Sequence, residues 1–100
     1  MKSPLFITRN KNRLEISISP IEDWDGFDKL IQYMIIQFSV TIIESIDGPG
    51  SRRWILELDG HQFELIHDDG YGNYLLAPTK DSEAIILKIA DDLEERLADL

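Results

Sequence analysis

Two short runs of alternating apolar and polar residues, joined by an Asp-Gly pair, constrain the fold of this chain most strongly. Residues 54–59 and residues 62–67 each place a large apolar side chain at every second position, with few exceptions. A period of two is typical of a half-buried strand, and Asp-Gly is a favoured two-residue turn between antiparallel strands. The segment therefore predicts a β-hairpin that turns at Asp59-Gly60.

Further strands are predicted on both sides of this hairpin. Residues 5–9 and 14–19 flank an Asn-Lys-Asn loop, and residues 39–46 are rich in the β-branched side chains that suit a pleated sheet. Residues 74–76 complete the set as a short last strand. Turns containing glycine or proline are predicted at residues 48–50 and 68–73.

Two segments change to the three- and four-residue spacing of an amphipathic helix. The first begins near Asp23 and runs to Phe38, with Asp23 or Asp25 as its N-cap. The second begins near Asp81, with Asp81 or Ser82 as its N-cap. The predicted apolar stripes are Trp24, Phe27, Leu30, Ile31, Met34, Ile35 and Phe38 in the first helix, and Ile86, Ile89, Ala90, Leu93 and Leu97 in the second.

The order of these elements is β-β-α-β-β-β-(β)-α, which predicts an α+β fold. Short loops between the later strands favour a mainly antiparallel sheet of four to six strands. Two amphipathic helices packed on one face of that sheet make a two-layer sandwich. One hundred residues, 43% of them hydrophobic, suit a single domain over residues 1–100.

The balance of charged residues and the absence of cysteine exclude several classes of function. Nineteen acidic and ten basic residues give a formal net charge of −9, which disfavours nucleic-acid and anionic-membrane binding, since both depend on Lys and Arg. Without cysteine, disulfides, thiol catalysis and cysteine-ligated metals are excluded. No apolar stretch approaches the ~20 residues of a membrane span, and the first apolar run is too short for a signal peptide. We therefore expect a soluble, cytoplasmic protein.

The two histidines, His61 and His67, are the first positions to consider for acid–base or metal chemistry. On one strand they share a face but lie about 20 Å apart, too far to bind one metal ion. Asp68 and Asp69 follow His67, but three adjacent residues rarely converge on one ion. A histidine bonded to a neighbour at a strand end is the favoured interpretation. Because no catalytic motif is present, we expect no enzymatic activity, no cofactor and no metal, and a hydrolase using His67 is the least favoured alternative.

All of the net negative charge falls in the second half of the chain. Residues 1–53 contain seven basic and seven acidic side chains, whereas residues 54–100 contain three and twelve. The plain interpretation is a solvated surface, and the functional one is an acidic contact surface for a basic protein. The candidate contact residues are Asp68, Asp69, Tyr71 and Tyr74 at the predicted turn, and Asp91 and Glu95 on the last helix as an alternative surface.

Residues 54–76, WILELDGHQFELIHDDGYGNYLL, are followed by a helix that ends in LEERLADL. This half of the chain resembles two groups of small bacterial proteins. One comprises short proteobacterial proteins of about this length that have no assigned function. The other comprises the immunity proteins of toxin–immunity systems, which are small, often acidic α+β domains of the cytoplasm. The second resemblance implies a protein-binding module that neutralises a basic toxin, such as a nuclease, by occluding its active site, and it assigns no individual residue.

A homodimeric structural or regulatory accessory domain is the alternative function. Such a protein would self-associate through an exposed strand edge, or through a patch formed by Tyr33 and Ile36, which fall off the first apolar stripe. The two hypotheses differ in what they predict. A basic partner implies salt-sensitive association, whereas a homodimer implies a doubled mass in solution.

Overall fold

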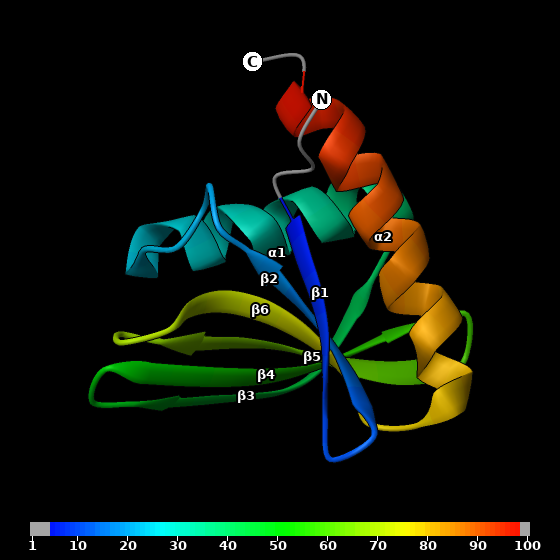
Figure 1. Cartoon of the computed structure of the whole chain (residues 1–100), viewed down its shortest axis with the longest axis horizontal. Coiled ribbons are helices and arrows are strands. Elements are labelled where there is room, and N and C mark those ends of the chain that lie inside the picture. Colours follow the sequence, from blue (N-terminus) through cyan, green and yellow to red (C-terminus); the bar gives the residue numbers. More distant parts are fainter. Residues whose placement is uncertain (1–4, 99–100) are drawn as a thin grey trace.

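The structure, a computed structural model that describes residues 5–98, consists of a six-stranded sheet with both helices on one face (Figure 1). Its elements are β1 (Leu5–Asn10), β2 (Arg13–Ile18), α1 (Trp24–Phe38), β3 (Thr41–Gly48), β4 (Ser51–Leu58), β5 (His61–Asp68), β6 (Gly72–Ala77) and α2 (Lys80–Ala98). The strands are arranged in the order β1-β2-β6-β5-β4-β3, and all neighbours are antiparallel. The predicted α+β class and order of elements are confirmed.

The tight turns of the sheet have the backbone conformation that their residues favour. Asp59 and Gly60 between β4 and β5 have φ of 54° and 80°, and Lys11 and Asn12 between β1 and β2 have φ of 52° and 66°. Two successive positive φ angles give the turn whose twist matches that of paired strands. The predicted hairpin at Asp59-Gly60 is therefore confirmed.

The core lies between the helices and the sheet face that they cover. Alternate residues of the central strands face it, as the pairing of Trp54 with Leu65 and of Leu65 with Leu75 shows. The largest fully buried apolar side chains are Ile16, Ile18, Leu56, Phe63, Leu65 and Leu75 from the strands, and Phe27, Met34, Ile86 and Ile89 from the helices. Each contributes on the order of 2 kcal/mol by leaving water.

Two boundaries and parts of one apolar stripe differ from the sequence prediction. Ser39 does not begin β3 but ends α1, with a left-handed φ of 61° and its N–H donating to the carbonyl of Ile35. Thr79, rather than Asp81 or Ser82, caps the start of α2, because its hydroxyl oxygen accepts from the N–H of Ser82. The hydroxyl of Ser82 donates instead to the carbonyl of Gln62 in β5, which fastens α2 to the sheet.

Trp24 and Ile35, both predicted to lie on the buried stripe of α1, are only partly covered. The capping prediction for α1 resolves to Asp23, whose carboxylate accepts from the N–H of Gly26 at 2.8 Å.

Three chain segments meet at one end of the sheet, on the left of Figure 1. They are the start of α1, the turn between β3 and β4, and the turn between β5 and β6. The N–H of Asp69 donates to the carbonyl of Gly50 at 2.9 Å, which joins the two turns. The C-terminal half of α2 lies at the top of Figure 1, away from these turns. Neither helix within residues 5–98 combines the length and apolarity that crossing a membrane requires.

Candidate functional site

Two hollows flank the turn between β5 and β6, and Tyr71 lines both. The larger, of about 410 Å³, lies between this turn and the start of α1 and is called the α1 hollow. Its lining residues are Glu22, Asp23, Trp24, His67, Asp69, Gly70, Tyr71 and Gly72. The smaller, of about 190 Å³, is called the sheet hollow and is lined by Asn10, Glu15, Asp68, Tyr71 and Tyr74. Together these residues form the surface that we call the acidic end.

A buried chain of polar side chains holds the walls of the α1 hollow together. The amide nitrogen of Asn73 donates to the carbonyls of Ile21 and Asp23, at 2.9 and 3.1 Å. This orientation directs the Asn73 Oδ1 to Nδ1 of His67, 2.8 Å away, so that Nδ1 is the donor. Nε2 of His67 lies 2.8 Å from Oδ1 of Asp69. The network therefore connects the segment before α1 to the β5–β6 turn.

His67 is 2% exposed and has an acceptor oxygen at each ring nitrogen. When the ring carries both protons, it donates to both oxygens and forms an ion pair with Asp69. Trp24 packs edge-on against the ring, with centroids 5.5 Å apart. The sequence-based interpretation of His67 as a histidine bonded to its neighbours agrees with these contacts.

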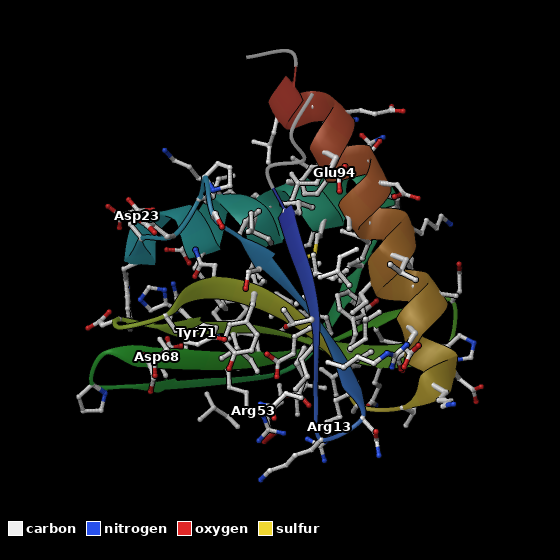
Figure 2. All side chains as sticks on the ribbon, viewed as in Figure 1. Arg13, Asp23, Arg53, Asp68, Tyr71 and Glu94 are labelled. Atoms are coloured by element: carbon white, nitrogen blue, oxygen red, sulfur yellow. The ribbon has the colours of Figure 1, made fainter. Side chains whose placement is uncertain are left out.

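The β5–β6 turn brings together the four candidate contact residues that the sequence predicted there. Asp68 accepts from the N–H of Gly70 at 2.9 Å, which stabilises the turn from within. Tyr71 is 66% exposed and lies edge-on to Tyr74, with centroids 5.5 Å apart. Figure 2 shows Asp68 and Tyr71 at the same end of the molecule as Asp23.

The Tyr74 side chain lies in a negatively charged environment at the sheet hollow. Burial raises the pKa of the Tyr74 phenol above its usual value, and the nearby carboxylates of Glu15 and Asp68 raise it further. A phenol among carboxylates stays neutral, because a phenolate there would be repelled. Tyr74 is thus available as a hydrogen-bond donor beside negative charge.

The other two candidate residues, Asp91 and Glu95, lie elsewhere. Both are exposed on α2, whose C-terminal half, marked by Glu94 in Figure 2, lies at the top of the view, apart from Tyr71 and Asp68 on the left. Asp92 beside them already has two partners within the protein. It accepts from the Tyr33 hydroxyl at 2.6 Å and from Arg96 at 2.7 Å, and these contacts hold the pKa of its carboxyl below the usual range. The six candidates therefore form two separate surfaces.

The predicted patch of Tyr33 and Ile36 does not form. Tyr33 is half-buried by Phe38 and bonded to Asp92, whereas Ile36 is 82% exposed. Other exposed apolar side chains are those of Ile35 and of the edge strand β3, namely Ile42, Ile43 and Ile46. The helical spacing of residues in α1 could not predict the burial of Tyr33, because its hydrogen-bond partner Asp92 lies on α2.

Arg52 is a buried anchor to which the sequence assigned no role. It is 6% exposed and pairs with Asp28 at 2.9 Å and Asp47 at 3.1 Å. Its guanidinium is surrounded by the rings of Trp24, Phe27 and Trp54, whose centroids lie 4.8, 4.4 and 5.1 Å from Cζ. The sequence did indicate this burial. Arg52 stands two positions before Trp54, so both side chains lie on the same, apolar face of the strand.

Glu15, Glu22 and Trp24 also belong to the acidic end but were not predicted as contact residues. They approach the turn only because β2 pairs with β6 and because Asn73 binds the segment before α1. Within residues 5–98, no group of three or more His, Asp or Glu side chains is placed to hold a metal ion.

Comparison of this chain with family models, with curated proteins and with solved structures finds no match. What the acidic end offers is a set of carboxylates and aromatic rings around two preformed hollows. Such an arrangement recognises positively charged groups that also present apolar surface.

Proposed function

We propose that the protein binds a basic protein through its acidic end and inhibits that protein by covering its functional cleft. In this proposal it acts in the cytoplasm, as an immunity protein does against a basic toxin such as a nuclease. The observation that carries the proposal is the meeting of carboxylates from three parts of the chain around Tyr71. Glu15 comes from β2, Glu22 from the segment before α1, and Asp68 from the end of β5.

In this proposal, charge and aromatic surface make different contributions to binding. The net charge of −9 attracts a basic partner over a distance and raises the association rate. Tyr71 and Trp24 supply the large, stiff side chains in which binding energy concentrates. Because His67 and Asn73 hold the walls in place before binding, little conformational entropy is lost on association.

Affinity capture from a lysate of the source cell at low salt tests the proposal. We expect one basic protein in near-stoichiometric amount, released as the salt concentration rises, because charge pairs exposed to solvent are screened. The captured protein should lose its own activity when it is mixed with the purified acidic protein. Capture of no basic protein, or full activity of the captured protein in the complex, would contradict the proposal.

A homodimer through the β3 edge is the second candidate function. Three exposed isoleucines of β3 and the unpaired edge of this strand support it. The experiment is the molar mass in solution of the native chain and of Ile43→Lys. A doubled mass that the substitution halves would support the homodimer, and the single-chain mass at all concentrations would exclude it.

A further inference from the structure

The α1 hollow presents hydrogen-bond acceptors that have no partner. Glu22 makes no ion pair or hydrogen bond within residues 5–98. Asp23 uses Oδ1 as the helix cap, and Asp69 uses Oδ1 toward His67, so each keeps Oδ2 unbonded in the described part of the chain. The ring nitrogens of His67 are already directed at Asn73 and Asp69. A ligand of this hollow must therefore supply donors and positive charge.

The size of the α1 hollow indicates the kind of cation that it can accept. Among residues 5–98, no group of three or more His, Asp or Glu side chains is placed to hold a metal ion. A volume of about 410 Å³ instead lies in the range of pockets for organic ligands, about 300–1,000 Å³. An organic cation with several N–H donors can reach carboxylates that come from different segments of the chain, as Glu22 and Asp23 before α1 and Asp69 after β5 do.

Aromatic walls distinguish a guanidinium from an ammonium ion. Trp24 is 38% exposed and Tyr71 is 66% exposed, and both line the hollow. A planar, weakly hydrated guanidinium packs on aromatic faces while its edge donates to carboxylates. Arg52 already makes this combination of contacts inside the protein, with its Cζ 4.8 Å from the Trp24 ring centroid and Nη1 paired with Asp28.

The hollow is formed before any ligand arrives. Gly72 has a φ of 90°, and a Cβ at this position would come within 3.2 Å of the Glu22 side chain. The close approach brings Glu22 beside the turn. On the other side, the Asn73 amide fixes the Asp23 carbonyl. A rigid site loses less entropy on binding than a loop that must first become ordered.

We propose that the α1 hollow binds the guanidinium group of an arginine side chain that projects from the basic partner. This inference rests on the proposed function and names the group that the acidic end recognises. Glu22, Asp23 and Asp69 receive the N–H donors, and Trp24 and Tyr71 contact the planar face. One arginine thereby acts as the anchor of the interface.

Nuclear magnetic resonance titration with two small probes, Nα-acetyl-arginine amide and Nα-acetyl-lysine amide, tests this proposal at low salt. The arginine probe should shift the Trp24 indole N–H and the backbone N–H of Gly70 and Gly72 to saturation, with a Kd on the order of millimolar. The lysine probe should bind at least about threefold more weakly, since it lacks the planar contact.

Two charge-matched double variants provide the control. Glu22→Gln with Asp69→Asn removes two charges from the hollow and keeps an oxygen facing His67, and should weaken arginine binding about tenfold. Asp91→Asn with Glu95→Gln removes two charges from α2 and should leave the Kd unchanged. Unsaturated shifts, equal affinity for lysine, or equal weakening by both variants would overturn the proposal. Since no partner protein is used, failure here with salt-sensitive capture intact would remove the arginine anchor and leave the proposed function standing.

Discussion

Asn73 illustrates how one buried amide determines the shape of a surface to which it contributes little area. It is 2% exposed, and it uses its nitrogen for two carbonyls and its oxygen for His67. All three bonds join β6 to segments that form the walls of the α1 hollow. A buried polar group with every bond satisfied specifies one arrangement, because any shift would leave donors or acceptors unpaired.

Replacement of Asn73 by alanine should therefore destabilise the fold. Asn73→Ala leaves the Ile21 and Asp23 carbonyls and the His67 ring without their partner, and we expect the free energy of unfolding to fall by about 3 kcal/mol. Urea denaturation measures this change. Gln32→Ala, at an exposed position of α1, is the matched control and should change stability by less than about 0.5 kcal/mol. Equal effects of the two substitutions would contradict the role given to Asn73.

Asp92 makes the stability depend on pH in a defined direction. Its pKa is lowered in the folded chain, first by the Tyr33 hydroxyl and then by Arg96. Its contribution is therefore present above the unfolded-chain value of about 4 and lost as the pH falls through the folded pKa. Asp92→Asn should cost about 1 kcal/mol at neutral pH, and the difference from the native chain should shrink toward zero in acid. A difference that stays constant with pH in urea denaturation would show that the carboxylate charge is not involved.

At the scale of elements, the sequence predicted what depends on neighbours in the chain. The period of two, the β-branched composition of residues 39–46, the Asp59-Gly60 pair and the helical stripes predicted two helices and six strands, the last of them as optional. Boundaries failed where a tertiary contact decided them. Ser82 does not cap α2, because its hydroxyl binds the carbonyl of Gln62 in β5. The pairing of β2 with β6 was likewise not predictable, since it joins strands separated by α1 and three strands.

The attachment of α1 to the sheet depends on Arg52. Arg52→Met removes the partner of Asp28 and Asp47 and the cation between three rings, so we expect a loss of about 3 kcal/mol in the free energy of unfolding. Arg52→Lys should recover less than half of this, because an ammonium ion cannot form the planar contacts. Lys29→Met, at an exposed position of the same helix, is the control. Equilibrium unfolding in urea gives all three values, and full recovery by lysine would show that charge alone matters.

At the scale of the whole molecule, only part of the candidate site could be predicted from the sequence. Asp68, Asp69, Tyr71 and Tyr74 are neighbours in sequence, so a turn was enough to bring them together. Asp91 and Glu95 belong to the same acidic half of the chain but lie across the molecule on α2. The composition gives the number of charged residues but not their positions in the fold. Other residues of the acidic end come from β1, β2, the segment before α1 and the start of α1, and the sheet order together with the bonds of Asn73 assembles them.

The distribution of charge also bears on self-association. The exposed edge of β3 carries Glu44 and Asp47, and its pairing shifts register between Ile42 and Glu44. Charges and a bulge on an edge strand oppose pairing with another edge, and two copies would bring together a charge of −9 each. We expect light scattering to give the single-chain mass of 11.5 kDa. A concentration-dependent doubled mass would favour the homodimer.

The most direct test compares two variants that lose the same amount of charge at different places on the molecule. Glu22→Gln with Asp68→Asn, at the acidic end, and Asp91→Asn with Glu95→Gln, on α2, each change the net charge from −9 to −7. Calorimetric titration of the captured basic partner against both variants and the native chain gives three dissociation constants. We predict a Kd at least about tenfold higher for the acidic-end variant and an unchanged Kd for the α2 variant. Equal weakening by both would mean that net charge alone attracts the partner, and a loss confined to the α2 variant would place the interface on that helix.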